Sequence, residues 1–420
     1  MKNYIDLVNE ELYINEVNGL KIYIMPKKKY KKKTAMLTVK YGANHIKFSV
    51  GLGEMKDYPL GIAHFLEHKL FEEKEGNIFN EFAILGTSPN AYTNSNVTCY
   101  HFTCTDFFQK NLELLIKFVF HPYFNEENVK KEREIIEQEI IMYNDNPSFR
   151  TYINALGLMY EKHPVKNDVA GTIESIKEIT PELLYECYHA FYTPQNMVLV
   201  ITGDVNVEEV LSLCDRLIPR SNGKQAATKY IFLDNSSISK YEVKEQMNIS
   251  IPNFVISYKD RLLSTSKKEM FLRKLCGDML IHTLFSKSSR LYNDLYSSGL
   301  INDTFEYEYV HEHDYSFFIC DGESNNPSRV AEEITKSVDY FRKHGLERED
   351  FNRSKKVLLG YYISRFNSIE ALSSFLNDIA VNEIDISFYY ELLKKIKIED
   401  LNRTLGEIFT DNGCVLSVVE

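Results

Sequence analysis

The sequence predicts an α+β fold in two halves of similar size. The chain has 420 residues, which at roughly 100 to 200 residues per domain suggests two or three domains. Strand-like and helix-like segments occur on both sides of residues 219–239, where the pattern lapses into Ser, Asn, Gly, Lys and Gln, a composition typical of a linker. We therefore expect an N-terminal half over residues 1–222, a linker over 223–239 and a C-terminal half over 240–420. No residue-level repeat relates the two halves.

The N-terminal half is expected to begin with two strands, followed by two helices. Residues 13–25 and 34–41 are rich in apolar and β-branched residues, and the lysine-rich residues 27–33 between them predict a solvated hairpin loop. The spacing of apolar residues then predicts helices over 60–73 and 77–85, and a glycine follows the second helix.

A hairpin, three helices and a buried strand are expected to complete this half. Residues 90–105 alternate with a period of two, which predicts the hairpin. Residues 107–118, 126–143 and 180–192 have the helical period. The apolar run that starts at residue 197 and ends in a Gly-Asp turn reads as a buried strand before a helix.

The C-terminal half repeats this mixture. Strand patterns occur at residues 248–258, 303–310 and 315–320, and helical patterns at 268–285, 328–343 and 347–366.

Composition and charge exclude several classes of protein. With 44% hydrophobic and 13% aromatic residues, the chain can form packed cores and is not intrinsically disordered. A net charge of −11 argues against a dedicated nucleic-acid binder. Residues 1–14 lack the apolar stretch of a signal peptide, and no run approaches 18 apolar residues, so we expect no stable membrane insertion. The seven cysteines form no Cys-x-x-Cys pair, so we expect reduced thiols and a cytoplasmic location.

One predicted helix carries reactive side chains within an otherwise apolar surface. His64, Glu67 and His68 form the string His-x-x-Glu-His. The two histidines lie one helical turn apart, so their imidazoles can bind one cation, and Glu67 projects from the same side. Buried imidazoles and carboxylates are costly unless they are paired or bound to metal. The string is the inverted form of a zinc-peptidase signature and needs a third ligand; hydrogen-bonded core histidines are the alternative.

The predicted helix near residues 125–146 supplies that third ligand. Glu132 and Glu139 lie within about 20° of each other on a helical wheel, in the middle of an apolar face. The apolar residues of this face are Ile135, Ile136, Met142 and Tyr143. Glu134 and Glu137 fall on the opposite side, where we expect solvent. Because an unpaired buried carboxylate costs several kcal/mol, a metal or a cationic partner best explains Glu132 and Glu139.

These residues resemble the pattern of the pitrilysin/insulinase family of inverted-motif zinc metallopeptidases (inverzincins), in particular its small bacterial members of about half the length of the full enzymes. His64, Glu67, His68, Glu132 and Glu139 match that pattern position by position. Further segments that look like family motifs are 86–93, 170–172, 191–197, 203–204, 288–292 and 298–301. The resemblance therefore covers nearly all of the chain.

The resemblance implies an architecture and a partner. Each half is expected to be a mainly antiparallel sheet with helices packed on one face, and the two halves together are expected to form half of a clamshell chamber. The C-terminal half would contribute to the substrate chamber and to dimerisation. The partner would be a second copy of this chain or a homologous subunit that lacks the zinc motif.

The resemblance also implies a role for each residue of the motif. His64, His68 and Glu139 would bind one Zn²⁺ and leave a fourth position for water, whose pKa zinc lowers toward about 7. Glu67 would act as the general base on that metal-bound water. Glu132 would be an outer residue that orients a ligand histidine.

The substrate-binding residues match the family less completely. Asn90, Ala91, Tyr92 and Thr93 look like the edge strand that takes the substrate as an added β-strand, a mode that reads extension rather than sequence. Family members commonly hold the substrate with an Arg and a Tyr of the second half, but the nearest stretch here, residues 295–302, has Tyr and Asn in those places. A partner subunit supplies the missing donors, or one of three tyrosines assists: Tyr296, Tyr307 or Tyr309.

We therefore expect a zinc-dependent metalloendopeptidase that hydrolyses short unfolded peptides. Its substrates would be oligopeptides in general or a ribosomally made, bacteriocin-like precursor that it processes. The alternative is a non-catalytic peptide-binding or scaffold subunit of a heterodimeric peptidase. Scaffold members typically lose the motif residues, which are intact here.

Two smaller patterns are expected to be structural. His311, His313 and Asp314 are more typical of a solvated loop before a strand than of a second metal site. Cys99 and Cys104 fall on opposite faces of a predicted strand, which favours structural thiols over a disulfide.

Overall fold

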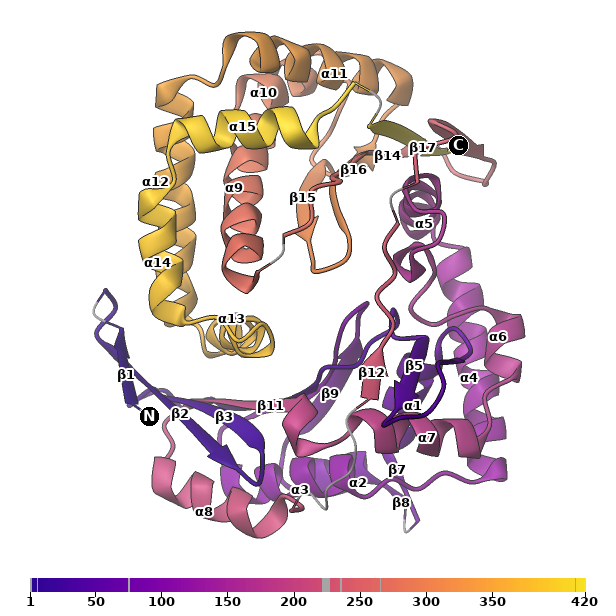
Figure 1. Cartoon of the computed structure of the whole chain (residues 1–420), viewed down its shortest axis with the longest axis vertical. Coiled ribbons are helices and arrows are strands. Elements are labelled where there is room, and N and C mark those ends of the chain that lie inside the picture. Colours follow the sequence, from indigo (N-terminus) through magenta and orange to yellow (C-terminus); the bar gives the residue numbers. More distant parts are fainter. Residues whose placement is uncertain are drawn as a thin grey trace. The chain divides into compact units, whose positions relative to one another are not determined.

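The chain forms two compact units, each assembled from segments that are distant in sequence (Figure 1). The computed structural model describes residues 2–5, 7–74, 76–220, 227–234, 236–264, 266–411 and 413–420. Unit 1 contains Met1–Ile140, Asp168–Tyr230 and Tyr362–Ser387, and unit 2 contains Ile141–Asn167, Ile231–Tyr361 and Phe388–Glu420. The α+β class with mainly antiparallel sheets is confirmed. The expected division into halves over 1–222 and 240–420 stays a prediction. The two compact units are interleaved in sequence and therefore do not follow that division.

Unit 1 is built on a seven-stranded sheet. In spatial order its strands are β1 (Lys2–Ile5), β2 (Glu10–Val17), β3 (Leu20–Pro26), β11 (Met197–Gly203), β4 (Lys33–Val39), β10 (Thr98–Cys104) and β9 (Ser88–Thr93). Only the pair of β3 and β11 is parallel among the described pairs of this sheet. Strand β9 therefore ends the sheet on one side.

Two expectations about the first strands were wrong. Residues 13–25 are not one strand, because Asn18 and Gly19 both have positive φ and form a tight turn between β2 and β3. Residues 27–33 do not join neighbouring strands, because β11 lies between β3 and β4. Every residue of β11 is buried, and a strand buried along its whole length needs hydrogen-bond partners on both sides.

Helices cover both faces of this sheet (Figure 1). On one face they share a core with inward residues such as Leu37 and Ile201. The helices of unit 1 are α1 (Ile62–Leu70), α2 (Ile78–Ile84), α3 (Phe108–Phe120), most of α4 (Glu126–Asn144), α6 (Ile173–Lys177), α7 (Pro181–Phe191), α8 (Val207–Leu217) and α13 (Ile369–Val381). The helices expected in the N-terminal half are thus confirmed to within a few residues.

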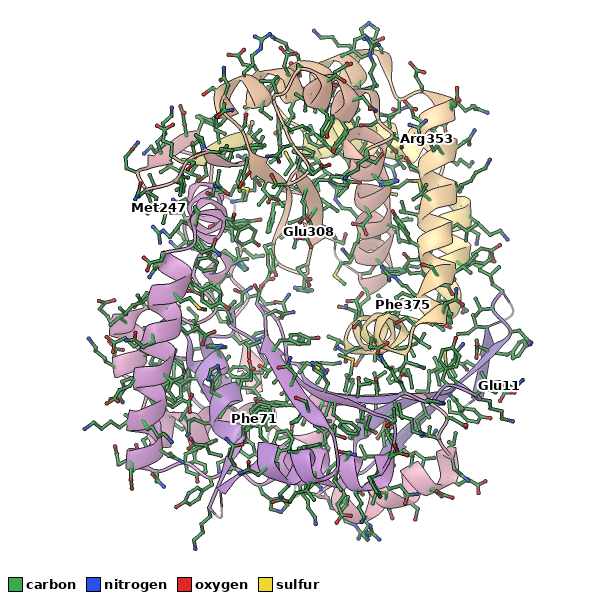
Figure 2. The ribbon with its side chains drawn as sticks, turned by 180° about the vertical axis from the view of Figure 1, so that it is seen from behind. Glu11, Phe71, Met247, Glu308, Arg353 and Phe375 are labelled. Carbon is green, nitrogen blue, oxygen red and sulfur yellow. The ribbon has the colours of Figure 1, made fainter. Side chains whose placement is uncertain are left out.

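The opposite face of the sheet is covered by α13, which comes from the C-terminal part of the sequence. Thr38 of β4 donates a hydrogen bond of 2.7 Å to Asn377, and the hydroxyls of Thr202 and Ser373 lie 2.5 Å apart. Phe375 of the same helix is buried (Figure 2). Unit 1 therefore depends on a helix that begins 166 residues after the last strand of its seven-stranded sheet, by the difference between Gly203 and Ile369.

Unit 2 is built on a five-stranded sheet. In spatial order its strands are β13 (Glu242–Glu245), β17 (Cys414–Val419), β14 (Asn253–Lys259), β16 (Ser316–Glu323) and β15 (Glu306–His311). Its helices, wholly or for the most part, are α5 (Pro147–Met159), α9 (Lys267–Phe285), α10 (Arg290–Ser297), α11 (Pro327–His344), α12 (Arg348–Ser364), α14 (Ile386–Lys395) and α15 (Ile398–Ile408). None of the described helices of the chain is long and apolar enough to cross a membrane.

The two units share one strand topology. Counted along the chain, β3, β4, β9, β10 and β11 lie in the spatial order first, fifth, second, fourth, third, and so do β13 to β17. In both sets the first and fifth strands are parallel. Helix α5 packs on β14 and β17, as α13 packs on the equivalent β4 and β11. The duplication is therefore structural, with one helix exchanged between the two halves of the sequence.

The expected linker is only partly described. Residues 223–226 and 235 lie outside the described residues. Ala227–Lys229 forms β12, which pairs with β5 (Lys47–Val50) in a small sheet completed by β6 (Lys56–Asp57). Asp234 is buried in unit 2, where its carboxylate pairs with Lys259 at 3.2 Å.

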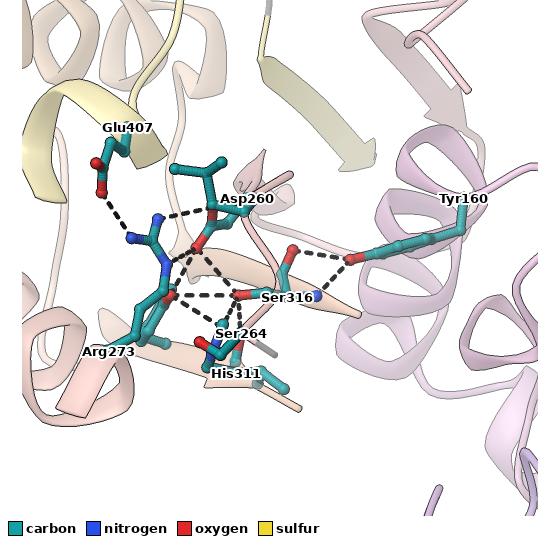
Figure 3. A network of polar contacts seen from close by, with 10 residues as sticks. Tyr160, Asp260, Ser264, Arg273, His311, Ser316 and Glu407 are labelled. Carbon is teal, nitrogen blue, oxygen red and sulfur yellow. Dashed lines mark hydrogen bonds and ion pairs between the residues drawn. The ribbon is translucent and has the colours of Figure 1, made fainter. Parts of the chain in front are cut away.

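The expectation of a solvated loop at His311 was wrong. His311 ends β15, is buried, and contacts the hydroxyls of Ser316 and Ser264 at 2.9 and 3.1 Å (Figure 3). Next to it, Arg273 donates two hydrogen bonds of 2.9 Å to Asp260. Burial lowers the pKa of His311 to about 4. The neutral imidazole thus belongs to a polar network inside unit 2.

Candidate metal centre

Helix α1 carries the two histidines of the motif. It begins after Gly61, whose φ is 84°, and a Cβ at this position would lie 2.2 Å from the carbonyl oxygen of Ala170. Only glycine fits such a close approach in this conformation. Buried apolar residues surround the helix, as expected from the sequence. His64 and His68 project together, with ring centroids 4.5 Å apart.

Glu139 of α4 reaches the same point. Its Oε2 lies 3.8 Å from Nε2 of His64 and 3.6 Å from Nε2 of His68. One ligand atom from each of the three residues lies within 4.8 Å of the others. Two imidazole nitrogens and one carboxylate oxygen form one of the donor sets of catalytic zinc sites. Burial, together with the neighbouring His68, lowers the pKa of His64 to about 3, which keeps this imidazole neutral. These residues therefore fit a zinc ion.

Glu132 lies behind His68. Its Oε1 is 3.0 Å from Nδ1 of His68, and its Oε2 is 3.6 Å from Nζ of Lys69. Burial opposes ionisation, but the hydrogen bond with His68 and the charges of His68 and Lys69 hold the pKa of Glu132 below its usual value. A carboxylate at Nδ1 directs the other nitrogen of His68 toward Glu139.

Glu67 lies beside the three candidate ligands. Its side chain is buried, and its Oε2 accepts a hydrogen bond of 2.5 Å from the hydroxyl of Thr93. Burial raises the pKa of Glu67, and Glu139 adds to the rise, against the effects of Thr93 and His68. The carboxylate is thus held next to the candidate metal position without being one of the three converging donors.

The predicted substrate strand lies next to Glu67. Asn90, Ala91, Tyr92 and Thr93 all belong to β9, which forms the end of the seven-stranded sheet. Strand β9 pairs with β10 on one side, in the register Thr93 to Thr98. Because Thr93 ends β9 and contacts Glu67, the edge of β9 that pairs with no other described strand reaches the candidate catalytic centre.

The three tyrosines proposed for substrate binding all lie in unit 2, where Tyr309 is fully buried and donates a hydrogen bond of 2.7 Å to Asp260. Tyr296 of α10 is 46% exposed and stacks on Tyr292. The hydroxyl of Tyr307 on β15 lies 2.9 Å from Nδ1 of His282. Their role in binding substrate stays a prediction.

The helical wheel of α4 was right about Glu132 and Glu134, and partly wrong about Glu137 and the apolar residues. Glu132 is buried and Glu134 is exposed, as expected, and Glu137 is half-buried. Ile135 and Met142, however, are 47% and 59% exposed. The apolar stripe is wider than the part of the helix that packs against the core, which Ile136 and Ile140 occupy.

Two residues near the centre were not expected from the sequence. Lys69, which stands between His68 and Leu70 in the sequence, is fully buried. The signal that could have indicated it was a lysine within an otherwise apolar stretch. Asp168 precedes the 170–172 motif, and burial, together with the charge of Glu139, raises its pKa. No spacing rule connects Asp168 to the histidines.

Two protein-family models and a curated relative match this chain. The protein-family model described as insulinase (peptidase family M16) matches residues 42–173. The protein-family model described as peptidase M16 inactive domain matches residues 178–358. The protein named uncharacterized zinc protease YmfH of Bacillus subtilis (strain 168) is 37% identical over 98% of this chain and 97% of its own length.

Solved structures extend the comparison to the fold. The crystal structure of an M16-like peptidase from Alicyclobacillus acidocaldarius superposes with a TM-score of 0.93, at 29% identity, over 98% of both chains. The periplasmic protease PqqL of Escherichia coli matches 97% of this chain with a TM-score of 0.75. That match covers 47% of the PqqL chain at 18% identity, so it shows the fold alone.

Proposed function

Because this chain belongs to the insulinase (M16) peptidase family, we propose that it is a zinc-dependent endopeptidase that hydrolyses short unfolded peptides. The observation that carries the proposal is the convergence of His64, His68 and Glu139 on one point, with Glu67 beside them. Zinc in this position supplies Lewis acidity toward the scissile carbonyl and toward the attacking water.

The side chains of the site divide the remaining work. His64, His68 and Glu139 would hold the ion, and Glu132 would orient His68 through Nδ1. Glu67 would take the proton of the attacking water and pass it to the departing amine. The hydrogen bond from Thr93 fixes the Glu67 carboxylate for this task.

The preference for unfolded peptides follows from the edge strand. An extended peptide that pairs with the free edge of β9 is read through its backbone, and a folded protein cannot offer such a segment. Because β9 reaches Glu67 at Thr93, a peptide on this edge passes the catalytic carboxylate. A ribosomally made precursor of the bacteriocin type is one substrate of this class.

We also propose that the working enzyme is a pair of chains, either two copies or this chain with a homologue that lacks the zinc motif. The support is that the chain corresponds to 47% of the longer PqqL chain.

The seven cysteines are all free thiols, which supports a reducing compartment such as the cytoplasm.

The first prediction tests Glu67. Glu67→Gln should keep zinc at the wild-type stoichiometry and lower peptide turnover by about 10²- to 10⁴-fold, the usual contribution of a general base. Zinc content and cleavage of a mixed peptide library are measured together, with and without a homologous partner subunit. Glu134→Gln, on the exposed side of α4, is the matched control.

Near-normal turnover by Glu67→Gln would refute the general-base role. A wild-type protein that binds zinc yet cleaves no peptide under any of these conditions would favour the non-catalytic scaffold function.

A further inference from the structure

Lys69 is an unusual residue for the position that it occupies. Its side chain has no exposed area, although it lies in α1 close to the buried apolar residues Phe65, Leu66 and Leu70. A charged lysine in such a place is costly unless it is paired. Its Nζ lies 2.5 Å from Oε2 of Glu72 and 3.6 Å from Oε2 of Glu132.

The carboxylate of Glu132 is shared between two partners. Oε1 contacts Nδ1 of His68, and Oε2 faces Lys69. A carboxylate can rotate and can turn either oxygen toward a donor. With a cation on one side and an imidazole on the other, one arrangement is favoured, and in it Glu132 accepts a hydrogen bond from Nδ1 of His68.

We propose that Lys69 is a positioning residue for the metal centre. It acts through Glu132: the ammonium group holds the carboxylate in place, the carboxylate holds Nδ1–H of His68, and Nε2 of His68 is thereby aimed at the point where His64 and Glu139 converge. This inference rests on the proposed zinc site and adds a residue to it.

Lys69 lies closer to Glu72 than to Glu132, but burial favours Glu132 as the functional partner. The Glu72 side chain is 23% exposed, so water can solvate its charge when Lys69 is absent. The Glu132 side chain is only 7% exposed. Loss of Lys69 leaves the buried carboxylate of Glu132 with His68 as its partner. Because a buried charge that loses its counter-ion is destabilised, the carboxylate and the groups around it change position.

The test measures metal affinity in the full-length protein. Lys69→Met should weaken zinc binding by about 10- to 100-fold, the usual effect of losing an outer-shell partner. Zinc affinity is measured by competition with a chelator, and the absorption spectrum of the cobalt(II)-loaded protein reports any change in ligand geometry. In a Glu132→Gln background, Lys69→Met should add no further loss, because its effect passes through Glu132.

Two controls separate this role from a purely structural one. Lys259→Met removes the buried Lys259–Asp234 pair of unit 2, so it should lower stability and leave zinc affinity unchanged. Glu72→Gln leaves Lys69 paired with Glu132, so zinc affinity should stay within about twofold of wild type, because the outer-shell partner of His68 is retained. This second control remains informative even if Lys69→Met does not fold.

Three results would overturn the proposal: wild-type affinity in Lys69→Met, an additive loss in the double variant, or a tenfold loss in Glu72→Gln. A wild-type protein that binds no zinc would instead refute the proposed function on which the inference rests.

Discussion

At the residue scale, the candidate centre depends on ionisable side chains that are partly buried side by side. His64, His68 and Glu139 come from two helices and converge within a few ångströms. The pKa of His64 is lowered by burial and that of Glu132 is lowered by its partners, so both residues are held in the form that a metal site requires. The chemistry of the site therefore depends on its burial as much as on the identity of the residues.

A second prediction concerns the ligand from α4. Glu139→Ala should lower zinc affinity by more than the 10- to 100-fold expected for outer-shell residues, because it removes a donor atom itself. Zinc content after dialysis and chelator competition measure the effect. Glu134→Ala on the same helix is exposed and serves as control; full zinc retention by Glu139→Ala would refute the ligand role.

At the element scale, the two strands that end the sheets at equivalent positions, β9 and β15, differ in the residues that they carry and contact. Strand β9 ends the sheet of unit 1 beside Glu67, and β15 occupies the same place in the sheet of unit 2. Strand β15 carries exposed Glu306 and Glu308, the latter labelled in Figure 2, and Glu306 pairs in register with Asp321 of β16. Burial, with the charges of Glu306 and Glu308, raises the pKa of Asp321 to about 6.

This cluster gives a prediction about pH. A carboxyl group whose pKa is higher in the folded state favours folding when protonated, so its contribution to stability falls as pH rises from about 4 through about 6. Asp321→Asn should therefore stabilise the protein at pH 7.5 more than at pH 4, as urea unfolding at both values measures. Asp303→Asn, at an exposed site, is the control; an equal effect of Asp321→Asn at both pH values would contradict the assignment.

At the scale of the whole molecule, the two units exchange one helix. Helix α13, near the end of the sequence, packs on β4 and β11 of unit 1, and α5, from the first half of the sequence, packs on β14 and β17 of unit 2. Each helix meets the equivalent pair of strands in a sheet of the same topology. The sequence halves are therefore mutually dependent.

This exchange predicts the behaviour of a fragment. The isolated segment 1–222 should not unfold cooperatively, because it exposes the sheet face around Thr38 and Thr202 that α13 covers in the whole chain. Circular dichroism during heating, compared with the full-length protein, measures the difference. A fragment that melts in one sharp transition near the temperature of the full chain would contradict the prediction.

Local patterns in the sequence determined most elements and the members of the candidate metal centre. Hydrophobic periodicity predicts α1, α4, α9 and β11 because each element buries one face or its whole length. Such burial requires apolar residues at a regular spacing within the element itself. The motif predicts His64, Glu67 and His68 together because one helical turn separates them. Glu139 follows from the cost of a carboxylate on an apolar helix face.

Only the tertiary structure decided which distant segments meet. The position of β11 between β3 and β4, the exchange of α5 and α13, the burial of His311 and the contact of Lys69 with Glu132 all join residues with no fixed spacing in sequence. Such contacts are selected by the packing and the charge balance of the whole core. The sequence by itself therefore determined what the site is made of, and the fold decided how its residues are held.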